Sequence, residues 1–117
     1  MAWQVAFADA FHAEYVALPQ MVQDELLLGV RLLEVYGPKL GRPHVDTLNG
    51  SEFANMKELR FRADDGVWRV AFAFDPKRNA ILLVAGDKSG TSQTRFYKRL
   101  IAAADARYKA HLKRLGT

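Results

Sequence analysis

Three short apolar runs separated by turn signals occupy residues 57–88, and they constrain the fold more than any other part of the chain. Arginines occupy alternating positions in the first two runs, and the third run, 80–85, is wholly apolar; both patterns are typical of β-strands. The pattern predicts strands over 57–62, 67–74 and 80–85. The Asp-Asp-Gly sequence at 64–66 predicts a hairpin turn, and the polar residues 75–79 predict another turn.

Helical patterns lie on both sides of this strand-forming segment. A weakly alternating run at 3–8 predicts a first strand, and helices are predicted over 10–18, 19–36 and 92–115. Residues 37–56 are rich in Gly, Pro and Asn and form the one long connection. The helix boundaries rest on capping and helix-breaking residues: Asp9 as a cap, Pro19, Gly37, Pro38, and Thr91 or Ser92 as a cap.

The predicted order of elements is β-α-α-β-β-β-α, which places the chain in the α+β class. We expect a small, mostly antiparallel sheet with the helices packed on one side. The chain has 117 residues, half of them hydrophobic, so we expect one domain spanning 1–117. The sequence contains no cysteine, which excludes disulfides and thiolate zinc sites.

The second predicted helix carries more apolar residues than one buried face requires. Leu28, Leu32 and Val35 widen its apolar stripe. Either the helix is nearly buried, or a partner covers its outer side. Burial against the domain's own sheet is the simpler interpretation. The residues that define the inner stripe recur at three- and four-residue spacing: Met21, Val22, Leu26, Leu27, Val30 and Leu33.

Charge is distributed unevenly along the chain. Residues 1–56 hold three Lys or Arg against seven Asp or Glu, whereas residues 57–117 hold fourteen against six. Such asymmetry is typical of a protein whose basic part binds a polyanion, and ordinary scatter of surface charge is the alternative. We see no signal peptide and no apolar run long enough to span a bilayer. A cytoplasmic location without a membrane partner is therefore expected.

Arginines occupy polar positions of the predicted sheet. Alternation places Glu58, Arg60 and Arg62 on one face, and pairing of the strands brings Arg60 or Arg62 near Arg69. We expect the alanines that follow Arg69 to leave an open floor. Opposed like charges destabilise a sheet, and a guanidinium donates to two phosphate oxygens at once. The cluster therefore predicts anion binding. In the alternative, each arginine pairs with a carboxylate nearby: Glu58, Asp64, Asp65 or Asp87.

Four segments carry a resemblance to a known family: LeuAsnGly at 48–50, AsnMetLysGluLeuArg at 55–60, TrpArgValAlaPhe at 68–72 and IleLeuLeuValAlaGlyAspLys at 81–88. With them, nearly the whole chain resembles the HigB-type, phage-derived branch of the RelE/ParE toxin superfamily, the toxins of bacterial type II toxin–antitoxin systems. The resemblance implies a ribosome-dependent mRNA endoribonuclease, or mRNA interferase, that inhibits translation. It also implies a cognate antitoxin, expected to be a helix-turn-helix protein with an acidic segment over the basic face. The second predicted helix is another possible antitoxin contact.

The resemblance assigns roles to individual residues. Arg69 matches the arginine of the family's aromatic–arginine strand position, and Lys88 matches the basic residue after the last strand. Some relatives have a second basic residue where this chain has Glu58, which is a candidate general base or a partner that orients the arginines. The resulting catalytic candidates are: Arg60, Arg69, Lys88 and Glu58. The candidate RNA-binding residues are: Arg62, Lys57, Arg95, Tyr97, with Phe96 as the alternative aromatic, and Lys98.

The implied reaction uses the 2′-hydroxyl of the RNA as the nucleophile, so no cofactor is expected. No metal is expected either, because the three histidines are scattered without the spacing of a metal site. Arg60 and Arg69 would stabilise the charge of the transition state, Lys88 would add to this or donate a proton, and Tyr97 would stack on a base. The alternatives are a ParE-like toxin that inhibits DNA gyrase and a nucleic-acid-binding module without activity.

Overall fold

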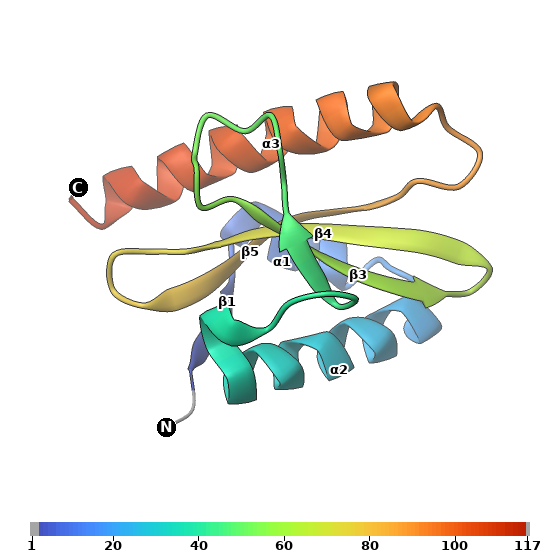
Figure 1. The fold of residues 1–117 in the computed structure, drawn as a ribbon, viewed down its shortest axis with the longest axis horizontal. Helices are drawn as coiled ribbons and strands as arrows, with labels where there is room; N and C mark the ends of the chain where they lie inside the picture. Colours follow the sequence, from blue (N-terminus) through green and yellow to red (C-terminus); the bar gives the residue numbers. More distant parts are fainter. Residues whose placement is uncertain (1–2, 117) are drawn as a thin grey trace.

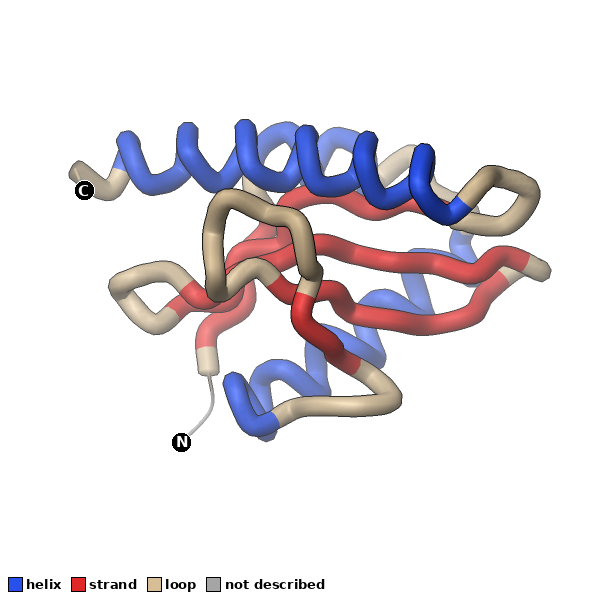
Figure 2. Tube along the Cα trace, turned by 45° about the horizontal axis from the view of Figure 1, so that its top comes forward, coloured by secondary structure: helices blue, strands red, loops and turns tan. Residues whose placement is uncertain are grey.

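A computed structural model describes residues 3–116 and shows a five-stranded sheet between helices (Figures 1 and 2). The predicted α+β class is confirmed, and the predicted strands and helices all exist. The long connection contains two additional short elements, β2 and the 3₁₀ turn η1, which the sequence analysis missed. The elements in chain order are β1 (Gln4–Phe7), α1 (Asp9–Tyr15), α2 (Gln20–Tyr36), η1 (Gly37–Lys39), β2 (Val45–Thr47), β3 (Lys57–Ala63), β4 (Gly66–Phe74), β5 (Asn79–Asp87) and α3 (Gln93–Arg114).

The strands are arranged in the order β1-β5-β4-β3-β2. The pairs β2–β3, β3–β4 and β4–β5 are antiparallel, and β1 runs parallel to β5. The expected mostly antiparallel sheet is therefore confirmed. The two helices between β1 and β2 carry the chain from one edge of the sheet to the other, which explains why β1 does not pair with the strand that follows it.

A tight turn joins β3 to β4 and fixes their register. Asp64 and Asp65 have φ angles of 50° and 60°. Positive φ at both positions matches the twist of a two-residue hairpin, so the predicted turn is confirmed. Gly66 opens β4, and a Cβ there would lie 2.6 Å from the Trp68 ring nitrogen, so a side chain has no room. The resulting register places Arg60 opposite Arg69.

Helices cover both faces of the sheet, so the expectation that they pack on one side is wrong. Helices α1 and α2 pack on one face, where Phe11, Leu26 and Leu33 lie in a core with Phe72. Helix α3 covers the opposite face (Figure 2). The physical reason lies in the central strands. Residues 70–73 of β4 and 80–83 of β5 are buried consecutively, and a strand without alternation needs apolar cover on both sides.

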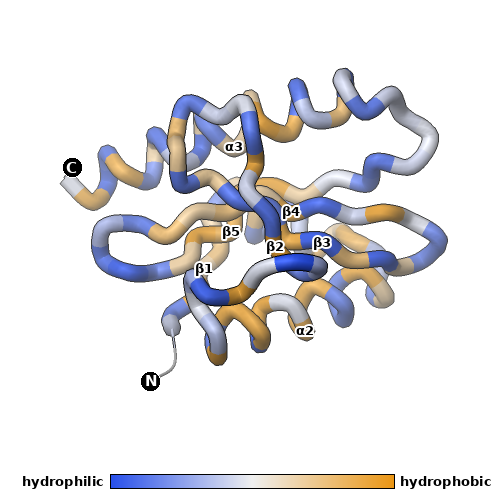
Figure 3. The backbone as a smooth tube through the Cα atoms, in the orientation of Figure 1, coloured by the Kyte–Doolittle hydropathy of each residue, from blue (hydrophilic) through white to orange (hydrophobic). Residues whose placement is uncertain are grey.

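Helix α2 buries only one side. Val22, Leu26 and Leu33 are fully buried, whereas Leu28 and Val35 are 59% and 66% exposed. The interpretation that the wide stripe is buried against the sheet is therefore wrong for its outer part. Figure 3 shows the helix as a largely hydrophobic segment at the edge of the molecule.

The predicted helix caps are partly confirmed. The Ser92 hydroxyl accepts a hydrogen bond from the Arg95 amide at 3.2 Å, as expected for the N-cap of α3. Asp9 does not cap α1, because Ala8 holds that position and the Asp9 carboxylate pairs with Arg114. Within residues 3–116, none of the helices combines the length and apolar character that crossing a membrane requires.

Candidate functional site

Arg60 and Arg69 meet on the face of the sheet that α3 covers. They are direct cross-strand partners on β3 and β4, and Glu58 lies two residues before Arg60 on the same face. The Glu58 carboxylate is 3.3 Å from Arg69 Nε and 3.4 Å from Arg60 Nη2. Its side chain is only 5% exposed. A single buried carboxylate thus holds two guanidinium groups side by side.

Tyr97, in the second turn of α3, completes this cluster. Its hydroxyl donates a hydrogen bond to Glu58 Oε1 at 2.7 Å and accepts one from Arg69 Nε at 3.3 Å. Burial of the ring and the hydrogen bond to Glu58 raise the pKa of Tyr97, so the phenol stays protonated near neutral pH. Phe96 is buried in the core beneath α3. The aromatic residue that faces the arginines is therefore Tyr97.

Strand β2 supplies an acidic residue that the sequence analysis missed. Asp46 Oδ2 lies 3.0 Å from Arg42 Nη2 and 3.5 Å from Arg60 Nη2. The amide of Thr47 donates to this carboxylate and, together with Arg42 and Arg60, lowers the pKa of Asp46. Its strand, Val45–Thr47, has three residues, which are too few to show the alternation that marks a β-strand in a sequence.

Lys88 follows β5, and its pKa is affected by the charges of Arg69, Arg60 and Glu58. Its burial, together with the charges of Arg69 and Arg60, lowers the pKa of Lys88, and Glu58 acts in the opposite direction. The neighbouring Asp87 carboxylate accepts from the backbone amides of Val67 and Ser89.

The predicted pairing of arginines with carboxylates holds for Glu58 alone among the four candidates. Within residues 3–116, neither Arg60 nor Arg69 pairs with Asp64, Asp65 or Asp87. A net positive charge therefore remains on the cluster, because one Glu58 carboxylate faces both guanidinium groups and Asp46 is shared with Arg42.

The expected open floor next to Arg69 is absent. Ala71 and Ala73 are fully buried under α3, because that helix covers this face of the sheet. The accessible space lies beside Arg60 instead. A hollow of about 310 Å³ is bordered by Glu58, Arg60 and Tyr97, by residues 46–49 at the end of β2, and by the first residue of α3. A second hollow of about 270 Å³ is lined by Arg60, Arg62 and Arg69 together with Pro43, Phe61 and Val67.

The remaining predicted RNA-binding residues lie outside this cluster. Lys57 shares the α2-facing side of β3 with Leu59, opposite to the arginines. Arg95 and Lys98 are exposed on the first turns of α3. The structure brings together the following predicted residues: Glu58, Arg60, Arg62, Arg69, Lys88 and Tyr97.

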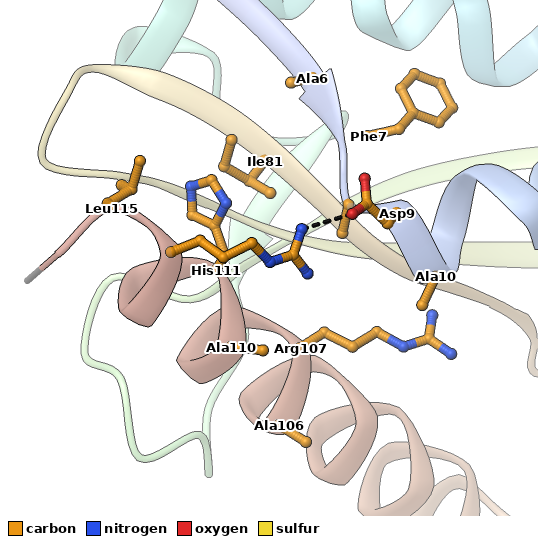
Figure 4. A pocket seen from close by; sticks show the side chains of 12 residues that line it. Ala6, Phe7, Asp9, Ala10, Ile81, Ala106, Arg107, Ala110, His111 and Leu115 are labelled. Atoms are coloured by element: carbon orange, nitrogen blue, oxygen red, sulfur yellow. Dashed lines mark hydrogen bonds and ion pairs between the residues drawn. The ribbon is translucent and has the colours of Figure 1, made fainter.

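A larger hollow of about 460 Å³ lies away from the arginine cluster, between the start of α1 and the C-terminal half of α3 (Figure 4). Its charged residues are already paired: Arg107 binds Glu14 through both terminal nitrogens, and Arg114 contacts Asp9 at 2.6 Å. These ion pairs join α1 to α3 around the edge of the sheet. The described residues include no group of three or more His, Asp, Glu or Cys side chains placed to hold a metal ion.

The fold is that of RelE. It is similar to a double arginine-to-alanine mutant of the E. coli toxin RelE in the free state, with a TM-score of 0.61 and 13% identity over 87% of this chain and 96% of that one. It is also similar to archaeal RelE in the RelE–RelB complex from Pyrococcus horikoshii OT3, with a TM-score of 0.56 and 19% identity over 78% of this chain and 100% of that one. At these identities, the likeness establishes a shared fold.

The chain belongs to the family described as "Phage derived protein Gp49-like (DUF891)", which matches residues 13–109. Two proteins of Mycobacterium tuberculosis H37Rv that are named as toxins are similar to it. HigB3 is 54% identical over 78 residues, which are 67% of this chain and 66% of HigB3. HigB2 is 48% identical over 84 residues, which are 71% of this chain and 41% of HigB2. The match spans less than two thirds of the length of either relative. These findings confirm the predicted resemblance to the HigB-type branch.

Proposed function

We propose that this protein is the toxin of a type II toxin–antitoxin system and acts as a ribosome-dependent, metal-independent mRNA endoribonuclease. The observation that carries the proposal is the pair of opposed guanidinium groups of Arg60 and Arg69 beside an accessible hollow. The toxin names of the HigB relatives and the RelE fold support the same function. A cytoplasmic location follows from this role, because the ribosome is there.

Each arginine retains hydrogen-bond donors for a phosphate. Arg69 Nη2 and Arg60 Nη1 take part in no hydrogen bond with another described residue. The Nε of Arg60 also lacks a partner within residues 3–116, but it is buried and therefore not open to a ligand. A phosphate that bridges the two groups would satisfy free donors and relieve the repulsion between like charges. The same donors would stabilise the extra negative charge of the phosphorane transition state.

Glu58 acts as a positioning residue in this proposal. Both of its oxygens are occupied, Oε1 by Tyr97 and Arg69 and Oε2 by Arg60. A general base needs an open oxygen within reach of the proton that it removes. The contacts of Glu58 therefore support orientation of the arginines over proton abstraction.

The proposed cleavage forms a bond from the RNA 2′-oxygen to phosphorus and breaks the bond from phosphorus to the 5′-oxygen of the next nucleotide. The 2′-hydroxyl loses its proton and the 5′-oxygen gains one. Lys88 is the proposed donor to the 5′-oxygen, because a lowered pKa makes its ammonium a better acid than an ordinary lysine. Tyr97 borders the hollow beside Arg60 and forms a wall for a base.

An antitoxin partner is part of the proposal. The P. horikoshii neighbour was solved as a RelE–RelB complex, and an acidic antitoxin segment suits the basic cluster of this chain. A helix-turn-helix protein is the expected partner.

Cell-free translation of a defined mRNA tests the proposal. Wild-type protein should produce breaks within the translated region when ribosomes are present, and Arg69→Ala should abolish them. Lys109→Ala is the matched control, because it removes an exposed cation that pairs with Glu52 away from the cluster. Intact mRNA together with gyrase inhibition would favour the ParE-like alternative. Salt-dependent RNA binding without breaks would favour the binding module.

A further inference from the structure

Helix α2 presents an apolar stripe to solvent on the side that faces away from the sheet. Met21, Leu28 and Val35 are 58%, 59% and 66% exposed. They are seven residues apart, so they lie in line along about 20 Å of the helix. Five of the six large apolar side chains that are exposed among the described residues lie on α2. Such clustering marks an interaction surface rather than scattered exposure.

The charges beside this stripe are arranged asymmetrically. Asp24 and Arg31 lie on one flank and Glu25 on the other, as follows from about 100° of rotation per residue. Asp24 and Arg31 are about 10 Å apart along the helix, which is too far for a direct ion pair. Arg31 makes no ion pair within residues 3–116, and Asp24 accepts only a hydrogen bond from Gln20. Both charges are therefore available to a partner.

We propose that this stripe is a self-association surface, on which α2 packs antiparallel against α2 of a second copy of the chain. A two-fold axis passing beside Leu28 would place Leu28 against its own copy and Met21 against Val35. This axis leaves the flank that carries Asp24 and Arg31 on the same side of the interface in both copies. Arg31 of one copy therefore lies against Asp24 of the other. The interface is then complementary in both apolar contact and charge, as an isologous dimer requires.

The charge pattern selects the antiparallel arrangement over the parallel one. In a parallel two-fold pair, opposite flanks face each other, and Asp24 would lie beside Glu25 of the other copy. Two such pairs of like charge would destabilise the dimer, whereas the antiparallel arrangement gives two pairs of opposite charge. Helices α2 and α3 cover opposite faces of the sheet (Figure 1), and the candidate nuclease cluster lies on the face that α3 covers.

Analytical ultracentrifugation of the full chain tests the proposal directly. We expect a monomer–dimer equilibrium with a dissociation constant on the order of 10 μM, because one helix pair covers less than a standard interface. Leu28→Asp should weaken it at least tenfold. Val16→Asp is the matched control, because it introduces the same charge at an exposed apolar residue outside α2 and should leave the equilibrium unchanged. Circular dichroism confirms that each variant is folded.

Exchanging the charges of Asp24 and Arg31 tests whether a second copy of the chain binds this surface. Asp24→Arg and Arg31→Asp should each weaken the dimer about fivefold to tenfold, because each breaks both cross-pairs. The double variant should restore the wild-type constant, since every pair is then reversed in sign. A wild-type chain that stays monomeric would overturn the proposal, even if a separate amphipathic helix bound the stripe. A dimer that persists in Leu28→Asp, or that the double exchange does not restore, would overturn it as well.

Discussion

Arg60 and Arg69 face each other directly across β3 and β4, and the buried carboxylate of Glu58 contacts both. Opposed cations cost stability in a sheet, and one carboxylate compensates only part of this cost. The tight turn at Asp64 and Asp65 nevertheless enforces this register. The arrangement is therefore built into the hairpin, which supports the proposal that the cluster binds an anion.

Replacement of Arg69 by alanine should slow cleavage strongly. We expect a rate loss of about 10²- to 10³-fold, comparable to the loss of one preorganised donor to a developing oxyanion. Arg69→Lys should recover only part of the rate, because an ammonium lacks the two-pronged geometry of the guanidinium. Single-turnover cleavage of ribosome-bound mRNA measures both effects. Equal rates for alanine and wild type would remove Arg69 from the site.

Replacement of Glu58 by glutamine separates its two proposed roles. If Glu58 positions the arginines, Glu58→Gln should keep part of the activity and the wild-type dependence of rate on pH. The free energy of unfolding should fall by about 1–3 kcal/mol, because two guanidinium groups lose their shared charged acceptor. Chemical denaturation and a pH–rate profile give the two readouts. Loss of the acidic limb of that profile would instead identify Glu58 as the general base.

Tyr97→Phe should destabilise the cluster without removing the ring. The variant loses the 2.7 Å hydrogen bond to Glu58, and we expect a cost of about 1–2 kcal/mol in unfolding free energy. Cleavage should slow by about tenfold, equivalent to about 1.4 kcal/mol, because Arg69 loses a contact that orients it. Tyr36→Phe is a suitable control, since Tyr36 is exposed at the end of α2. An unchanged rate would show that the hydroxyl has no positioning role.

The pH dependence of cleavage should report on Lys88. A general acid must be protonated, so the rate should fall as the pH rises through the pKa of Lys88. That pKa is lowered in the folded protein, so the alkaline limb should begin below the ordinary lysine value of about 10.4. Lys88→Arg should move the limb to higher pH, because arginine holds its proton more firmly. A limb that does not move would exclude Lys88 as the proton donor.

The hairpins and the placement of the arginines on one face could be predicted from the sequence, because they depend on residues that are close together in the chain. Alternation along β3 put Glu58 and Arg60 on one side, and the turn residues fixed the pairing with β4. The sequence analysis missed Asp46, because the three residues of β2 show no period of their own. Helical spacing favoured Tyr97 over Phe96 as the aromatic residue of the site, but the register of α3 was not fixed by it. Packing of α3 decided this by burying Phe96 and turning Tyr97 toward Glu58.

The amino-acid sequence by itself determined the strands, their turns and the placement of arginines on one face, because a two-residue period and local turn geometry are properties of neighbouring residues. Only the tertiary structure decided which face each helix covers, and with that the closure of the floor at Ala71 and the exposure of Leu28. These outcomes depend on contacts between segments far apart in the chain. Both faces of the sheet carry apolar residues that must be covered at the same time, and the pattern of one segment does not show which helix covers which face.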